Sequence, residues 1–316
     1  MIKIQLDNEM IQGIKESHWN DMRNAQTGLY KKLQDENCRD ILKGNPNYGG
    51  LYEYFYDVAD DVIEENVKRL VLANKSDMQE YIFSFGKFSK GESDELQKNI
   101  FRYEQFSKRK NAQDILGKMK VNVCPYCNRQ YTFTLKSYKV RPQFDHFYPK
   151  SLYPYLAVSI FNLIPSCSIC NQAKGSLDTY REDILYPYDD EFGEDVKFVI
   201  DEYDVSSLMG MSEDFEISID CSGIDSKKRC KVERQKELLH LEKLYNMHKD
   251  YACDIVLNRY INSDDRINEI LSKFPGLFTS RDDVLRVMCM NDTQKDSWGK
   301  RVLEKFTHDI VKWNEV

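Results

Sequence analysis

Apolar residues recur at helical spacing through the N-terminal part of the chain. Because side chains three or four positions apart share one face of an α-helix, this pattern predicts amphipathic helices. A second long helix is expected to begin at Ser93, and the clearest break is the segment 43–50, which contains Pro46 and three glycines. Residues 1–120 are therefore predicted to be a helical region. The clearest helical series consists of Leu51, Phe55, Val58, Val62, Val67 and Leu70.

The middle of the chain has a different pattern, with alternating residues rich in Tyr, Thr, Phe and Val. The segments Gln130–Leu135 and Tyr138–Phe144 alternate, as the two strands of a β-hairpin do. Such a hairpin would end its second strand at the dipeptide Asp145–His146. Further on, 152–161 is expected to form a small helix or a packed loop, and a helix is expected to start within 171–176.

The C-terminal part combines short strands with helices. Alternation predicts strands at 197–203 and 215–221, and from Ser226 the spacing becomes helical, with further helices near 281–290 and 293–313. One apolar stripe of this region consists of Leu238, Leu241, Tyr245, His248, Ala252 and Ile255. The histidine on this stripe is expected to be a core or interface residue. The chain is thus predicted to be a mainly helical α+β protein.

The composition is that of an ordinary globular protein. With 316 residues, of which 41% are hydrophobic and 12% aromatic, the chain can build a sizeable core. No N-terminal apolar run is typical of a signal peptide, and no stretch approaches the ~18 apolar residues of a membrane span. We therefore expect a cytoplasmic protein that makes no contact with a membrane.

Charge is distributed unevenly along the chain. The net charge is −7, yet residues 101–150 hold 11 Lys or Arg against 3 Asp or Glu, and 178–204 hold 11 acidic against 2 basic residues. A basic surface binds nucleic-acid phosphates by displacing their counterions, so Lys108, Arg109 and Lys110 are candidate nucleic-acid contacts. The alternative is a solvated helix face. The acidic segment would repel DNA, so we expect it to face away from DNA or to meet a partner protein.

Four of the nine cysteines form two C-x-x-C pairs, Cys124 with Cys127 and Cys167 with Cys170. Chance alone predicts roughly 0.2 such pairs in a chain of this composition. Two pairs can close a tetrahedral four-thiolate site with no open position, which is typical of structural zinc. A thioredoxin-like redox site would need one pair in a βα context, and catalytic zinc would need a position for water.

The order of the polar motifs between and beside these pairs resembles the HNH endonuclease family. The motifs are D-H-x-x-P-K-S from Asp145, N-L-I-P from Asn162, and C-x-x-C-N-x-x-K-G from Cys167. The resemblance covers some fifty residues and implies a ββα-metal nuclease unit, here residues 121–186, between the helical region 1–120 and the region 187–316.

This resemblance also implies roles for single residues. His146 would be the general base, Asp145 and Asn171 would bind the catalytic divalent ion, and Asn162 would orient the loop beside the base. The chemistry agrees, because an imidazole can take a proton near neutral pH and two oxygen ligands leave room for water and phosphate on Mg²⁺. Asn171 stands where some members carry a final histidine. Lys174 is a candidate phosphate contact, or otherwise a solvated lysine at a helix end.

Within that family, the motifs are similar to those of the HNH subunits of Septu-type anti-phage systems. This similarity implies a DNA-cleaving defence nuclease that acts with an ABC-type ATPase partner. Three other functions share parts of the pattern: a stand-alone restriction or mobile-element nuclease, an RNA-directed toxin nuclease, and a zinc-containing DNA-binding module without catalysis.

Overall fold

The computed structural model describes the whole chain except residues 57–59, 136–139, 202–203, 209–210 and 314–316. It divides into two compact units. The first unit comprises Gln5–Val121 and Thr132–Asp183, and the second comprises Met1–Ile4, Asn122–Tyr131 and Ile184–Val316. The expected boundaries near residues 120 and 186 thus lie close to the points where the chain passes from one unit to the other, but the N-terminal helices share a unit with the Asp145 region. Within the described ranges, no helix has the length and apolar character needed to cross a membrane.

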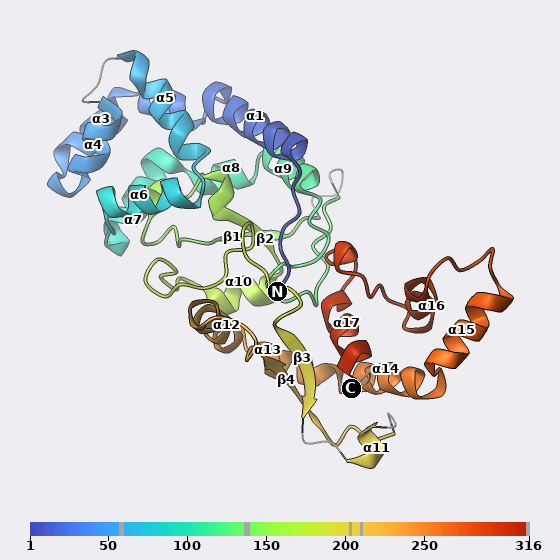
Figure 1. Cartoon of the computed structure of the whole chain (residues 1–316). Coiled ribbons are helices and arrows are strands. Elements are labelled where there is room, and N and C mark those ends of the chain that lie inside the picture. The colour runs from blue at the N-terminus through green and yellow to red at the C-terminus, as the bar shows by residue number, and fades with distance from the viewer. Residues whose placement is uncertain (57–59, 136–139, 202–203, 209–210, 314–316) are drawn as a thin grey trace. The chain divides into compact units, whose positions relative to one another are not determined.

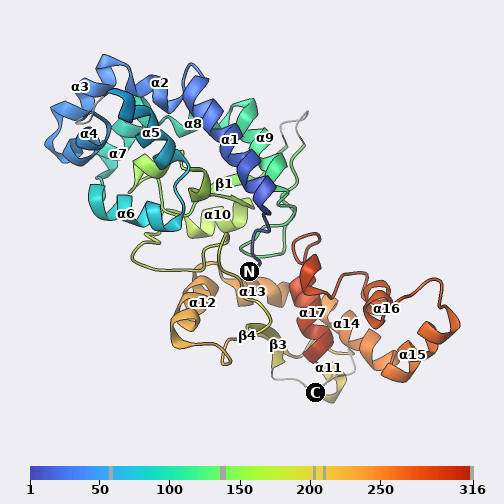
Figure 2. The same ribbon diagram turned by 45° about the horizontal axis from the view of Figure 1, so that its top comes forward.

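The N-terminal region is helical, as its apolar spacing predicts. Side-chain caps begin several of its helices, including capping boxes at Asn74 with Asp77 and at Ser89 with Glu92. Helices α1 and α9 lie side by side in this unit (Figures 1 and 2). The helices before the first strand are α1 (Asn8–Asn24), α2 (Leu29–Leu33), α3 (Glu36–Gly44), α4 (Gly49–Tyr56), α5 (Asp60–Val71), α6 (Lys75–Phe85), α7 (Lys90–Leu96), α8 (Tyr103–Ser107) and α9 (Lys110–Met119), with a 3-10 turn η1 at Pro46–Tyr48.

The helical series of the sequence falls on α4 and α5, where Leu51, Phe55, Val67 and Leu70 are buried; Val58 lies outside the described residues. The long helix expected from Ser93 is wrong. Helix α7 passes into a π-helical turn, η2 (Gln97–Phe101), and stops at Arg102, whose backbone is left-handed (φ 48°). A left-handed residue cannot continue a right-handed helix. The helices that follow Arg102, α8 and α9, are therefore separate from α7.

The first unit contains one two-stranded antiparallel sheet. Strand β1 (Gln143–His146) pairs with β2 (Leu163–Ser166), with Asp145 opposite Ile164. Of the expected hairpin, one cross-strand pair is present, an antiparallel bridge between Leu135 and Val140, while residues 136–139 lie outside the described residues. The described part of the first segment forms no regular strand, and Tyr131, Phe133 and Leu135 are about half exposed. All four residues of β2 are buried, so burial selects β2 as the partner of β1.

A packed loop and a helix complete this part of the fold. The loop between β1 and β2 holds the 3-10 turns η3 (Pro154–Leu156) and η4 (Ile160–Asn162), so the expectation of a packed loop is confirmed. Helix α10 (Ser168–Lys174) follows β2 and packs against β1 (Figure 2). It begins earlier than expected because the Cys167 sulfur caps it, accepting a hydrogen bond from the Cys170 N–H.

The second unit contains another two-stranded sheet. Strands β3 (Lys197–Asp201) and β4 (Glu216–Asp220) pair antiparallel, which confirms the two strands expected there; Tyr203 lies outside the described residues. Helix α17 (Glu304–Trp313) packs against β3 and α14 (Figure 1). The other helices of the second unit are α11 (Val205–Leu208), α12 (Ser226–Leu238), α13 (Leu241–Tyr245), α14 (Lys249–Ile261), α15 (Asp264–Lys273) and α16 (Arg281–Met288), with 3-10 turns η5 (Asn246–His248) and η6 (Lys295–Ser297).

Two C-terminal expectations change in the structure. The apolar stripe does not lie on one helix, because His240 adopts a left-handed backbone (φ 51°) between α12 and α13. The helix expected over 293–313 begins only at Glu304. His248 is half-buried and accepts a hydrogen bond from Arg129 at 2.9 Å, in agreement with a histidine in a packed interface.

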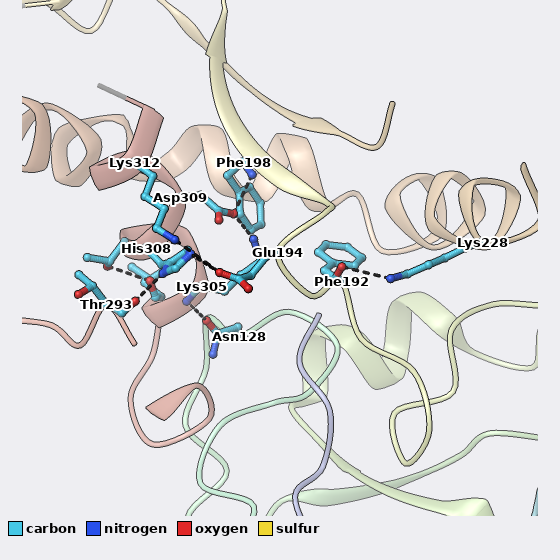
Figure 3. A network of polar contacts seen from close by, with 12 residues as sticks. Asn128, Phe192, Glu194, Phe198, Lys228, Thr293, Lys305, His308, Asp309 and Lys312 are labelled. Carbon is cyan, nitrogen blue, oxygen red and sulfur yellow. Dashed lines mark hydrogen bonds and ion pairs between the residues drawn. The ribbon is translucent and has the colours of Figure 1, made fainter. Parts of the chain in front are cut away.

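A buried polar network anchors α17 in the second unit (Figure 3). Lys305 and Asp309 form an ion pair one helical turn apart, with both side chains almost fully buried. The Asp309 carboxylate also accepts from the Phe198 N–H of β3 at 2.9 Å, and the Asn128 amide oxygen accepts from the Lys305 N–H at 3.2 Å. Because a buried charge is costly unless paired and hydrogen-bonded, these contacts fix the position of α17 on β3.

Candidate functional site

The predicted catalytic side chains come together at the end of β1. Asp145 and His146 on β1 and Asn171 on α10 line one cavity of about 510 Å³. Asn162 lies behind the cavity and is completely buried. Strand β1, the loop after it and helix α10 therefore position all four residues.

His146 is held with one ring nitrogen available. Its Nε2 lies 3.0 Å from the carbonyl oxygen of Ala157. A carbonyl only accepts, so the proton is on Nε2 and the lone pair is on Nδ1. The Tyr103 ring and the imidazole pack in a T-shaped arrangement with centroids 4.3 Å apart. Burial lowers the pKa of His146 to about 3, against the hydrogen bond to Ala157, so the ring is neutral at pH 7 and its Nδ1 carries no proton.

Asp145 is paired with Lys174 inside the protein. The lysine Nζ lies 3.2 Å from the Asp145 Oδ1 and donates to the main-chain oxygen of His146 at 2.6 Å. Both side chains are almost fully buried. The expected contact between Lys174 and phosphate is therefore wrong for this arrangement, because the ammonium compensates the carboxylate and holds the end of β1.

Asn171 supplies a second oxygen donor from α10. Its amide nitrogen donates to the Gln143 side-chain oxygen at 2.6 Å, and both residues line the cavity. A carboxylate and an amide oxygen at one cavity are the hard ligands that Mg²⁺ prefers, with further positions left for water and phosphate oxygens. The donor set of Asp145 and Asn171 thus fits a divalent cation.

Asn162 ties together the loop that passes His146. Its side-chain oxygen accepts from the Tyr148 N–H at 2.8 Å, and its amide nitrogen donates to the carbonyls of Tyr148 and Leu156, each at 3.0 Å. The Phe147 N–H also donates to the Asn162 carbonyl at 2.8 Å. A side chain with these bonds orients the loop and does not reach the cavity.

The basic run 108–110 is only partly available to a ligand. Lys108 and Lys110 are exposed. Arg109 instead forms an ion pair with Asp21 and donates to both oxygens of Thr27 at 2.6 Å. The expectation that Arg109 binds nucleic acid is therefore wrong, because its fork of donors is already occupied within the first unit.

The two C-x-x-C pairs form one group of sulfur atoms. The sulfurs of Cys124, Cys127, Cys167 and Cys170 all lie within 4.8 Å of one another. Ligands of tetrahedral zinc at ~2.3 Å would be roughly 3.8 Å apart, so the group fits a structural zinc ion. Main-chain N–H groups of Arg129 and Cys170 lie 3.4 Å from the sulfurs of Cys127 and Cys167, as donors that stabilise thiolates do.

Several residues of the cavity were not singled out from the sequence, among them Tyr103, Gln143 and Lys150. Gln143 precedes Asp145 by two positions on β1, so the period of a strand could have placed it on the same face. Lys150 belongs to the D-H-x-x-P-K-S motif, yet no role was assigned to it. No local pattern connects Tyr103 to His146.

Comparison with known proteins finds a partial match. Over 72 residues the chain is 40% identical to the Septu protein PtuB of Bacillus thuringiensis. Part of this chain is similar to a Septu protein. The match covers 23% of the chain and spans about a quarter of the relative, 26% of its length. No family model and no solved structure matches the chain. The expected similarity to Septu proteins is thus confirmed over that stretch, and the HNH family stays a prediction.

Proposed function

We propose that this protein is a metal-dependent nuclease of the HNH type that hydrolyses DNA phosphodiester bonds. The observation that carries the proposal is the position of His146: its Nε2 is bound to the Ala157 carbonyl while the ring lines the cavity that Asp145 and Asn171 share. Activation of water next to a phosphate needs a base and ligands for a metal ion. A neutral imidazole with its lone pair on Nδ1 can be the base, and the two side-chain oxygens can be the metal ligands.

The side chains of the cavity would divide the reaction between them. His146 Nδ1 takes a proton from a water molecule as the water oxygen bonds to phosphorus. The bond between phosphorus and the leaving sugar oxygen breaks, and that oxygen takes a proton from solvent water. Asp145 and Asn171 would hold Mg²⁺, which stabilises charge on the phosphate oxygens when bound. Lys174 acts as a positioning residue, because it fixes both the carboxylate of Asp145 and the main chain of His146. Asn162 keeps the loop, and with it the Ala157 carbonyl, beside the base.

The partial match to a Septu protein supports a proposal about the biological setting. We propose that the nuclease is the effector of an anti-phage defence system and works with an ABC-type ATPase partner. The structured chain beyond the Asp145 region provides surface for such a partner, and the exposed Lys108 and Lys110 provide positive charge for DNA.

The test compares two histidines changed in the same way. His146→Asn keeps a side chain that can donate to Ala157 but removes the base, so Mg²⁺-dependent cleavage of plasmid DNA should fall ~10²-fold or more. His240→Asn is the matched control, because His240 is exposed on the second unit and asparagine tolerates its left-handed backbone. Equal cleavage by wild type and His146→Asn would reject the proposed active site.

A second variant separates metal binding from proton transfer. Asn171→Ala removes one oxygen ligand, so its cleavage rate should recover in part at high Mg²⁺, whereas that of His146→Asn should not. The same reactions run on RNA distinguish a DNA nuclease from an RNA-directed one. DNA binding by wild type without any cleavage, with or without Mg²⁺, would point instead to a non-catalytic binding module.

A further inference from the structure

A second cavity adjoins the one that contains His146. Its volume is about 390 Å³, and the two cavities share Tyr103, Lys150 and Ser151. The end of α7, the π-helical turn η2 and the start of α8 form its other walls. The residues that line it besides the shared ones are Ser93, Asp94, Gln97, Lys98, Arg102, Glu104 and Gln105.

The backbone at this second cavity has an unusual conformation. Arg102 is left-handed (φ 48°, ψ 43°) and directly follows the π-helical turn. Both features are uncommon in a helical segment and occur preferentially at functional positions. The Gln97 side chain donates to the Pro154 carbonyl at 2.8 Å, so the turn is tied to the loop that also carries Ala157, the partner of His146. The turn that precedes Arg102 is therefore linked to the loop that holds the partner of the base.

Three cationic side chains line this cavity, those of Lys98, Arg102 and Lys150. Among the described residues, no carboxylate lies within ion-pair distance of Lys98, Arg102 or Lys150, although Asp94 and Glu104 also line the cavity. The Nε of Arg102 is buried and has no hydrogen-bond partner in the part of the chain that the structure describes. Arg109 and Lys174, by contrast, are both paired with aspartates. Positive charge at this cavity is thus left for a ligand.

Tyr103 connects the two cavities. Its ring forms a T-shaped pair with the His146 imidazole, with centroids 4.3 Å apart, and the Lys150 Nζ lies 5.3 Å from the centre of the same tyrosine ring. A chain of phosphates with one member at His146 would therefore continue past Tyr103 towards Lys150 and Arg102.

We propose that Arg102, with Lys98 and Lys150, binds the backbone phosphate next to the one that is cleaved. This inference rests on the proposed function and deepens it: the substrate is a polynucleotide strand held at two or more phosphates, and not a small phosphodiester. Arginine suits this role because its planar fork can bind phosphate through two parallel hydrogen bonds. Phosphate contacts of this kind give affinity without reading the base sequence.

The first experiment measures binding, which does not depend on cleavage. A fluorescent DNA oligonucleotide is titrated with wild type, Arg102→Gln, Lys98→Gln and the control Lys43→Gln, which removes an exposed lysine at the end of α3 that lines neither cavity. Arg102→Gln should weaken binding by about tenfold and reduce the slope of log affinity against log salt by about 1. Lys98→Gln should show a smaller loss in the same direction, and Lys43→Gln none.

The second experiment compares two substrates of the same enzyme. The rate on DNA divided by the rate on bis(p-nitrophenyl) phosphate, which has a single phosphate, should fall about tenfold in Arg102→Gln and stay constant in Lys43→Gln. Melting curves show whether each variant is folded. If Arg102→Gln does not fold, Lys98→Gln takes its place in both experiments.

The outcomes separate this inference from the proposed function. Wild-type binding and salt slope in both Arg102→Gln and Lys98→Gln would overturn the inference, as would an equal loss on both substrates. If the wild type hydrolyses neither substrate while Arg102→Gln still binds DNA more weakly than Lys43→Gln, the nuclease proposal fails and the phosphate site stands.

Discussion

Two histidines of the first unit, His146 and His18, each donate a hydrogen bond to a main-chain carbonyl, but they differ in what surrounds the ring. His146 donates through Nε2 to the carbonyl of Ala157, and His18 on α1 donates through Nε2 to the carbonyl of the next residue, Val158, at 2.8 Å. His18 is completely buried against the edge of Phe106, whereas His146 lines the cavity. The bond fixes the tautomer in both, but only His146 presents its second nitrogen where a substrate can reach it.

His18 should make stability depend on pH. Burial lowers its pKa to about 4, and Arg109 adds to this effect against the hydrogen bond to Val158, whereas the unfolded value is ~6.5. The stability is therefore complete above pH ~6.5 and is lost as the pH falls towards ~4, because the unfolded chain binds a proton that the folded chain does not. Between pH 7 and pH 5 the free energy of unfolding should fall by roughly 2 kcal/mol on this account.

Urea unfolding of wild type and His18→Gln at these two pH values measures the effect. The quantity to compare is the change with pH within each protein, since the substitution also removes packing. The wild type should lose roughly 2 kcal/mol more than the variant between pH 7 and pH 5. An identical change in both proteins would show that the pKa of His18 is the same in the folded and the unfolded chain.

The loop between β1 and β2 shows why the N-terminal helices matter to the site. Several of them donate to it or accept from it, and these bonds surround the segment that carries the Ala157 carbonyl. The bonds are those of His18 to Val158, Phe88 to Leu152, Gln97 to Pro154, Tyr155 to Gly86, and Ser159 to Leu70. The helices thus form a support that holds the partner of the general base, in addition to the bonds made by Asn162.

Removing the side chain of Asn162 should loosen this loop. Asn162→Ala leaves the main-chain groups of Tyr148 and the carbonyl of Leu156 without their buried partners, so the free energy of unfolding should fall by about 2–4 kcal/mol. Cleavage should fall as well, because the Ala157 carbonyl is no longer held beside His146. Asn171→Ala is the control for stability: Asn171 is only partly buried and its hydrogen bond to Gln143 is exposed, so we expect a change within about 0.5 kcal/mol. A melting temperature equal to that of wild type in Asn162→Ala would contradict this role.

For the chain as a whole, the four-cysteine group is the feature whose loss should have the widest effect. Metal analysis should find about one zinc ion per chain, and a chelator should lower the melting temperature because zinc binding contributes directly to folding. Cys124→Ser should act in the same way. Cys230→Ser is the matched control, because Cys230 is exposed and lies outside the group. Folded protein without zinc, or equal melting of the two variants, would exclude a structural zinc site.

The residues of the candidate site could be named from the sequence because they are residue types at short spacings. Two C-x-x-C pairs, an Asp-His dipeptide and an Asn directly after the second pair already restrict the possible ligands and bases, and the structure brings their side chains together as described. The mainly helical class and the strands β3 and β4 could be predicted for a similar reason, since apolar periodicity is a local property.

The partners of charged and extended residues could not be predicted from the sequence, because they depend on contacts between distant segments. Lys174 meets Asp145 across 29 positions and Arg109 meets Asp21 across 88, which removes both cations from the expected phosphate contacts. Alternation marked Gln130–Leu135 as a strand, yet β1 pairs with Leu163–Ser166, the segment whose side chains can all be buried. The free energies of burial and of charge pairing depend on the groups that surround a residue in the folded protein. The partner of a charged residue and the pairing of a strand are therefore decided only when the chain packs.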